Sequence, residues 1–261
     1  MMHTTHVIAT IFSARLQTSL KNRIPVFVSL LNTALLGLSV YVIIEVFFNN
    51  TSTIGGWDKD QSIVLYGSFI AIRSFVQMIV LPNCQAISRL ISSRGIDSYL
   101  LRPIDAQFVL AFSEIRIWNI FGIILGLGLM LYGTSAVVEL GIGSLLIFGA
   151  MLLIAFVIVY ALWFAVISLA FWTKKTSNIS HLLFMFLTTG RFPAAAYPEW
   201  MQIILISVIP IFFIIEVPAQ SILGLSSGTT IVGGIVATAV LLVITRMIWA
   251  RGVQKYLTDG A

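Results

Sequence analysis

The feature that most constrains the fold is a series of long apolar runs with few or no charged side chains. The run at 141–171 contains no Asp, Glu, Lys or Arg. Further apolar runs lie at about 25–48, 61–82, 107–132 and 231–250. A helix of about 20 apolar residues crosses the hydrocarbon core of a bilayer and satisfies its own backbone hydrogen bonds there. We therefore predict an all-α polytopic membrane protein with one span in each run.

The composition excludes a soluble fold. Hydrophobic residues make up 59% of the 261-residue chain and charged residues only 10%, whereas a soluble domain usually has about 25% charged residues. The length allows about six spans with their connections, and no soluble catalytic domain fits in the remainder. Cys84 is the only cysteine, which excludes an intrachain disulfide. His3 and His6 have no carboxylate ligand nearby, so no metal site is expected.

The N-terminal segment, 1–24, has the pattern of an amphipathic helix. Its apolar residues share one helical face, with basic and polar residues elsewhere; they are Ile8, Ile11, Phe12, Leu16 and Leu20. Such a helix lies in the plane of the membrane interface. We predict that it lies on the cytoplasmic surface and that 25–261 forms a single transmembrane domain.

The distribution of basic residues predicts the orientation of the spans. If the N-terminus is cytoplasmic, twelve of the fifteen Lys and Arg residues fall at the inner ends of spans, and only Lys59 and Arg191 fall outside. Cytoplasmic loops carry this excess in membrane proteins. Both termini are therefore expected in the cytoplasm. The net charge of +5 reflects this topology, so we expect no nucleic-acid partner.

The segment between 178 and 230 must make one net crossing, although it is long enough for two. In one layout, 178–196 crosses outward and 199–222 forms an extracellular re-entrant hairpin that is broken at Pro210 and leaves Glu216 near water. In the other, 178–198 stays at the inner surface and 200–220 crosses as a kinked helix. A proline frees backbone groups that cannot face lipid. Because a hairpin packed on protein accommodates them, the first layout is favoured.

The loop at 83–106, between the second and third spans, is polar and basic. Gly95 predicts a helix break, and a short amphipathic element, 96–101, follows it. Pro103 disfavours helical geometry at the residue before it, so this element ends at Arg102. The loop is expected to form a defined knob at the membrane surface. A plain connector that follows the positive-inside bias is the alternative.

Arg73 and Glu114 lie well inside predicted spans, where an unpaired charge is costly. Arg73 is about 13 Å from the inner end of the second span, and Glu114 is about 10 Å from the inner end of the third, at 1.5 Å per residue. Such depths would let them form an ion pair between these spans. The alternative places Arg73 on a translocation path, in contact with an anionic group of a substrate.

Two sequence blocks resemble a known family. GIDSYLLRPIDAQF, Gly95 to Phe108, is similar to the Leu-Leu-Arg-Pro signature that precedes the third span in one bacterial branch of the type-2 ABC exporters. The region from Phe171 to Gly224 is similar to a second signature of that branch. Its matching dipeptides are Tyr197-Pro198, Ile209-Pro210, Pro218-Ala219 and Leu223-Gly224. Glu216 departs from this pattern, because an apolar, Asn or Tyr residue is expected there.

The resemblance implies a permease subunit that forms half of a membrane dimer with an identical or paralogous permease. Two copies of a separate cytoplasmic ATPase would hold ATP and Mg²⁺, so this chain would bind no cofactor and would not be an enzyme by itself. The implied ATPase-coupling residues are Arg94, Gly95, Asp97, Tyr99, Leu100, Leu101, Arg102 and Pro103. The implied extracellular gate comprises Tyr197, Pro198, Pro210, Glu216, Pro218 and Gly224.

The function expected from this resemblance is ATP-driven export of an amphipathic, lipid-like or drug-like molecule across a bacterial cytoplasmic (inner) membrane. An ion-coupled secondary transporter or channel, working without an ATPase, is the alternative. A third possibility is an intramembrane hydrolase, because Gly224–Gly228 matches the Gly-x-Ser-x-Gly pattern around Ser226. Small residues in a turn before a helix explain that string more simply.

Overall fold

The computed structural model describes residues 23–101, 105–137, 141–173 and 177–258. Five helices in these ranges are long and apolar enough to cross a membrane, or up to six if one bent pair of helices counts as a single span. The chain is therefore a multi-pass, all-helical membrane protein. The predicted amphipathic helix at 1–24 lies outside the described residues, apart from the last two.

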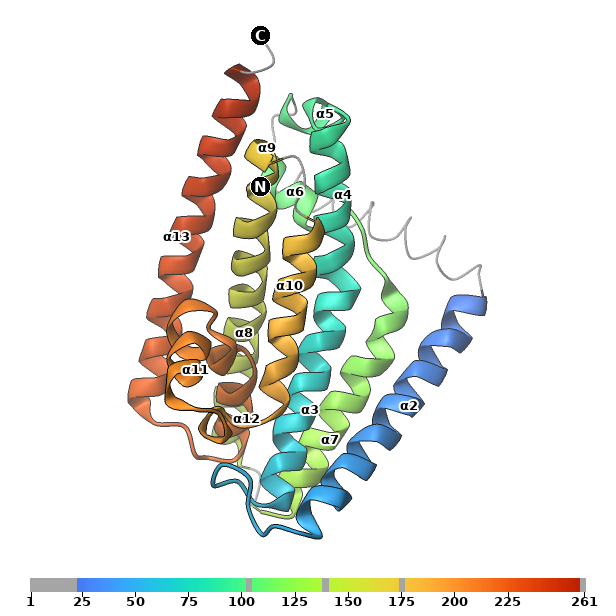
Figure 1. Cartoon of the computed structure of the whole chain (residues 1–261), viewed down its shortest axis with the longest axis vertical. Helices are drawn as coiled ribbons and strands as arrows, with labels where there is room; N and C mark the ends of the chain where they lie inside the picture. Colours follow the sequence, from blue (N-terminus) through green and yellow to red (C-terminus); the bar gives the residue numbers. More distant parts are fainter. Residues whose placement is uncertain (1–22, 102–104, 138–140, 174–176, 259–261) are drawn as a thin grey trace.

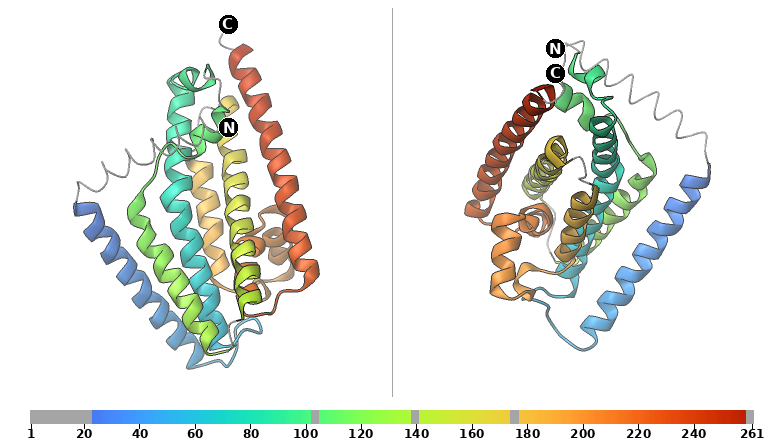
Figure 2. Two further views of the ribbon diagram at one scale, coloured as in Figure 1. Left: turned by 180° about the vertical axis from the view of Figure 1, so that it is seen from behind. Right: turned by 45° about the horizontal axis from the view of Figure 1, so that its top comes forward.

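The spanning helices run side by side, with α2 at one edge of the bundle and α13 at the other (Figures 1 and 2). Their bounds are α2 Arg23–Phe48, α3 Lys59–Phe75, α4 Leu81–Ser92, α7 Ile120–Ser135, α8 Ile142–Ser168 and α13 Gly228–Thr258. The π-helical turn η1, Val76–Val80, joins α3 and α4 into one continuous helix of 34 residues. The ends of α4 and α13 lie at one end of the molecule, and the end of α2 lies at the opposite end (Figure 1).

Helix α3 lies at the centre of the bundle and packs backbone to backbone against α7 through small residues. A Cβ atom on Gly126 would lie 2.5 Å from the amide nitrogen of Ala71 and 2.6 Å from the carbonyl oxygen of Gly67. Van der Waals packing drives helix association in lipid, where apolar burial offers little. Glycine at this contact therefore permits an approach that no other residue allows.

The predicted third span, 107–132, is wrong as a continuous helix. The structure has α6, Ala106–Ala111, then a non-helical stretch at 112–116, and then η2, Ile117–Asn119, which leads into α7. The side chain of Asn83 stabilises this break, because its Oδ1 accepts the Glu114 backbone N–H at 2.7 Å and its Nδ2 donates to the Glu114 carbonyl at 2.8 Å. An amide side chain thus replaces the hydrogen bonds that a helix would have made.

The same break satisfies a carbonyl that Pro82 leaves free. Pro82 has no N–H to donate to the carbonyl of Met78, one helical turn earlier. The backbone N–H of Arg116 donates to that carbonyl at 2.8 Å instead. The continuous helix consequently extends well past the predicted end at 82, because the proline falls in the first turn of α4 and its missing bond is supplied by a neighbour.

The predicted fifth span, 178–196, is also interrupted. Helix α10 covers Ser177–Leu187 and gives way to two 3-10 turns, η3 at Thr188–Arg191 and η4 at Ala194–Ala196. Phe192 has an extended backbone, as expected for a residue that precedes a proline. Pro193 therefore ends the helical geometry before the span reaches its predicted limit.

The glycine contact between α3 and α7 can be tested with one methyl group. We expect Gly126→Ala to lower the thermal stability of the purified protein, because overpacking a close contact costs about 1–3 kcal/mol. Gly128→Ala is the matched control, since it lies on the same helix with nothing within 4 Å of its Cβ position. Equal melting temperatures for both variants in the same detergent would contradict this role for Gly126.

Candidate functional site

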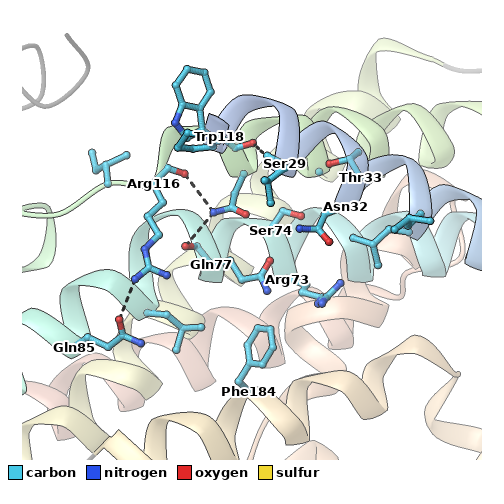
Figure 3. A pocket seen from close by; sticks show the side chains of 18 of the residues that line it. Ser29, Asn32, Thr33, Arg73, Ser74, Gln77, Gln85, Arg116, Trp118 and Phe184 are labelled. Carbon is cyan, nitrogen blue, oxygen red and sulfur yellow. Dashed lines mark hydrogen bonds between the residues drawn. The ribbon is translucent and has the colours of Figure 1, made fainter. Parts of the chain in front are cut away.

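A polar cavity of about 960 Å³ lies between α2, the α3–α4 helix, the break before α7, and α10 (Figure 3). We call it the α2–α3 cavity. Its polar lining comprises Ser29, Asn32, Thr33, Ser39, Arg73, Ser74, Gln77, Gln85, Arg116, Asn119 and His181. A cavity of this size at membrane depth is large enough for a small-molecule ligand. It is the candidate site for a transported molecule.

Helix α2 contributes a stripe of polar residues to this cavity. Ser29, Asn32, Thr33 and Ser39 are spaced so that they share one helical face. The Ser29 hydroxyl donates to the backbone carbonyl of Trp118, which fixes α2 against the break before α7 (Figure 3). The rest of α2 is mostly exposed and apolar, which is typical of a surface that meets lipid or another protein.

Arg73 lies on the opposite wall, and its guanidinium points into the cavity near Phe184 (Figure 3). The guanidinium carbon is 5.9 Å from the centre of that ring, within the range of a cation–π contact. The predicted pair with Glu114 is wrong, because the ion pairs among the described residues are Lys59–Glu45 and Arg246–Asp105. Glu114 belongs instead to the broken stretch that Asn83 holds, so it is not carried on a helix that faces Arg73.

Arg116 completes the cavity at its other end. Its Nη2 donates to Oε1 of Gln85 at 3.1 Å (Figure 3), while its backbone N–H serves the Met78 carbonyl described above. None of the residues that the described structure places along the cavity is acidic. The cavity therefore combines hydrogen-bonding side chains with two permanently cationic groups.

The part of the 83–106 loop that follows α4, which we call the knob, forms an ordered turn. Arg94 has a left-handed backbone with φ of 57°, and the Ile96 N–H bonds to the carbonyl of Leu90 at 3.2 Å. The short helix α5, Asp97–Leu100, follows. Ile96 is fully buried, whereas Leu101 is 85% exposed. Ile96 thus packs in the core, while Leu101 is exposed at the surface of the knob. Arg94 and Asp97 are also exposed.

The knob is attached to α13 on both sides. The Tyr256 hydroxyl donates to Oδ1 of Asp97 at 2.8 Å, and Arg246 pairs with Asp105 at 2.8 Å. Arg246 also donates to Oε1 of Gln107 at 2.9 Å. Tyr99 and Leu100, both predicted to contact an ATPase, are half-buried and pack against the core. Arg102 and Pro103 lie outside the described residues.

The bent helix pair is formed by 199–207 and 212–222, with an angle of 71° between its two halves. It contains α11, Glu199–Ile203, the π-helical turns η5, Ile204–Val208, and η6, Phe212–Glu216, and α12, Val217–Ile222. Ile209 has an extended backbone, which is the conformation that a following proline imposes. Pro210 therefore marks the bend, and the segment is not one straight rod.

Glu216 is buried in this segment and does not lie near water as predicted. Its Oε2 accepts the Ala194 backbone N–H at 2.8 Å, and its Oε1 accepts from Nε2 of Gln220 at 3.2 Å. The carboxylate thus binds the turn after α10 to the bent pair. A buried carboxylate needs such donors because water cannot reach it.

Pro218, two residues after Glu216, lies in the first turn of α12, directly after the π-helical turn η6. In the π-helical turn before it, the carbonyl of Ile215 accepts a hydrogen bond from the buried hydroxyl of Ser68, on α3, at 2.7 Å. The bent pair is therefore fastened to the central helix of the bundle.

Tyr197 and Gly224 stand at the two ends of the bent pair. The Tyr197 hydroxyl donates to the Thr189 carbonyl at 2.6 Å, and burial raises the pKa of its phenol, so the donor stays protonated. Pro198 precedes α11 as its cap residue. Gly224 has φ of 70°, a left-handed conformation that suits glycine after a helix. Of the predicted gate residues, only Glu216 and Tyr197 bond directly to the 188–196 turns.

Comparison with known proteins gives one match. A family described as ABC-2 family transporter protein matches residues 34–260 of the chain. The match takes in the α3–α4 helix, the knob, the bent pair, all of α13 and more than half of α2. No curated protein and no solved structure shows a significant match.

The link between Ser68 and Ile215 provides a test of how the bent pair is held. We expect Ser68→Ala to lower the free energy of unfolding by about 1–3 kcal/mol, because a buried carbonyl loses its donor. Ser168→Ala is the control: this buried hydroxyl bonds to the Phe164 carbonyl within its own helix. Thermal unfolding in one detergent would compare them, and an equal or larger loss for the control would argue against the link.

Proposed function

Because the chain belongs to the ABC-2 transporter family, whose members are membrane components of ABC transporters, we propose that it is a permease subunit coupled to a separate ATPase. The observation that carries this proposal is the family match over residues 34–260 in a multi-pass helical chain. The complex would export an amphipathic, lipid-like or drug-like molecule. ATP and Mg²⁺ would be held by two copies of the ATPase, and this chain would supply half of the pathway.

The knob is the proposed coupling element. It lies at the end of the bundle where α13 terminates (Figure 1). Leu101 is the most exposed of its apolar residues, and burial of a leucine at an interface contributes about 1.5–3 kcal/mol. Arg94 and Asp97 offer charges of both signs beside it. The hydrogen bond from the Tyr256 hydroxyl to Asp97 would hold the knob against α13 when the ATPase changes conformation.

The bent pair is the proposed extracellular gate, in the form of a re-entrant hairpin. Both of its halves lie in the half of the molecule where α2 ends and α13 begins (Figure 1). Buried hydrogen bonds through Glu216 and Ser68 supply the partners that a broken backbone needs in a membrane. A bend of 71° is too large for a straight crossing.

The proposed orientation places both termini in the cytoplasm of a bacterial cell, with the chain in the inner membrane. Among the described residues, the knob end of the bundle carries Arg89, Arg94, Arg251 and Lys255, whereas Lys59 and Arg191 lie towards the opposite end. A second permease, identical or paralogous, would pack beside this chain. The polar stripe of α2 would then face a pathway shared by the two subunits.

The coupling role of the knob can be tested at its exposed leucine. We expect Leu101→Glu to reduce substrate-stimulated ATP hydrolysis by the reconstituted complex about tenfold or more, because an interface leucine contributes about 1.5–3 kcal/mol. Leu257→Glu is the control, since Leu257 is 57% exposed on α13 near the same end. Failure of any ATPase to co-purify with the unmodified chain, or equal activity of both variants, would refute the proposal.

The re-entrant layout can be tested by cysteine labelling, because Cys84 is buried and supplies little background. We expect Trp200→Cys and Ser226→Cys both to react with a membrane-impermeant maleimide added to intact spheroplasts, since both ends of the bent pair would face outward. Ser93→Cys, at the end of α4, should react only after permeabilisation. A kinked full crossing would instead protect the cysteine at 200 in intact spheroplasts.

A further inference from the structure

Arg73 lies too deep in the bundle to reach water at either end. At 1.5 Å per residue, it is about 21 Å along the helix axis from Lys59 and about 28 Å from Ser92. The hydrocarbon core of a bilayer is about 30 Å thick, so the guanidinium lies within it. A charge at this depth is costly unless a counter-charge or a wet cavity compensates it.

No carboxylate in the described part of the chain forms an ion pair with Arg73. Its surroundings are the ring of Phe184 and neutral polar side chains, including Ser74, Gln77 and Asn32 (Figure 3). Arginine stays protonated in proteins, so the cavity carries a permanent positive charge. Arg116 adds a second positive charge to the cavity, and its hydrogen-bond partner, Gln85, is uncharged. The α2–α3 cavity is therefore built with an excess of cations.

The cavity also offers apolar surface for a second part of a ligand. Val28, Leu35 and Leu36 of α2 line one wall, and Leu81 and Phe184 line the other. Its volume, about 960 Å³, exceeds what a small inorganic anion requires. A lining that combines cationic groups with aliphatic and aromatic ones suits a molecule with an anionic head and an apolar chain.

We propose that the α2–α3 cavity binds an anionic amphiphile, such as a single-chain phospholipid, with its phosphate or carboxylate at Arg73. This inference rests on the proposed function, because it names the class of molecule that the permease would carry. The arginine would supply charge-assisted hydrogen bonds, which are stronger than those to neutral donors. Gln77 and Asn32 would complete the hydrogen bonds of the head group.

The test uses the purified chain in phosphatidylcholine nanodiscs, without an ATPase. Two probes carry the same diazirine-labelled acyl chain: lysophosphatidic acid, which is anionic, and lysophosphatidylcholine, which is zwitterionic. After photolysis, mass spectrometry measures labelling of peptides that line the cavity. We expect the anionic probe to label them about tenfold more than the zwitterionic one, because a buried guanidinium discriminates strongly by charge.

Three variants assign this preference to Arg73. Arg73→Gln should bring the two probes within about threefold of each other. Arg73→Lys should give an intermediate preference, because lysine can carry the charge but a buried lysine loses it more readily than arginine. Arg251→Gln, an exposed arginine on α13, controls for net charge and should behave like the unmodified chain. If Arg73→Gln does not fold, Arg116→Gln provides a second loss of charge in the cavity and should weaken the preference.

Several results would overturn the proposal. Equal labelling by both probes in the unmodified chain would remove the charge preference, and an undiminished preference in Arg73→Gln would place it elsewhere. Displacement by inorganic phosphate at the same concentration would indicate a simple anion site. Because the assay contains no ATPase, any of these results leaves the permease function standing. Conversely, a chain that binds the anionic probe but associates with no ATPase would refute only the proposed function.

Discussion

Hydrogen bonding of the backbone is the constraint on which this structure depends. In a bilayer, a carbonyl that loses its helical partner finds no water, so each interruption of a helix requires another donor. Pro82 frees the carbonyl of Met78, and the N–H of Arg116 takes the vacant place. In the π-helical turn before Pro218, the carbonyl of Ile215 accepts a hydrogen bond from the hydroxyl of Ser68. Both hydrogen bonds connect segments far apart in the sequence, so the irregular segments also hold the bundle together.

These interruptions position the functional elements. The break at 112–116 separates α6 from α7. Its residues Ile115 and Arg116, together with Trp118 of η2, form part of the wall of the α2–α3 cavity. The bend at Pro210 returns the chain toward the end from which α13 starts. A bundle of uninterrupted helices would have neither feature. The irregular backbone is thus confined to places where protein or a polar cavity surrounds it.

Much of the fold was predictable because apolar runs of membrane length leave little choice. The all-helical, multi-span architecture follows from them, and the bend at Pro210 follows from the conformation that proline imposes on Ile209. The break at 112–116 was not predictable, since it contains neither Pro nor Gly and is held by Asn83 from another helix. The burial of Glu216 was missed for a similar reason, as its donor, Ala194, lies in a turn that no local pattern specifies.

The candidate site was only partly visible in the sequence. Arg73 was identified as a costly charge, but its expected partner, Glu114, lies in the broken stretch and forms no pair with it. The stripe on α2 was overlooked, although the spacing of Ser29, Asn32 and Thr33 within an apolar span indicates a polar face. The knob was predicted from Gly95, whereas its attachment to α13 required coordinates, because Tyr256 is 159 residues from Asp97 in sequence.

That attachment gives α13 a mechanical property. The helix has 31 residues without interruption, so it is a rod about 46 Å long whose C-terminal part is fastened to the knob through Tyr256 and Arg246. Its first residue, Gly228, follows the bent pair by only a few residues. A displacement applied at the knob would therefore reach the bent pair as a shift of one stiff helix, without a chain of intermediate side-chain rearrangements.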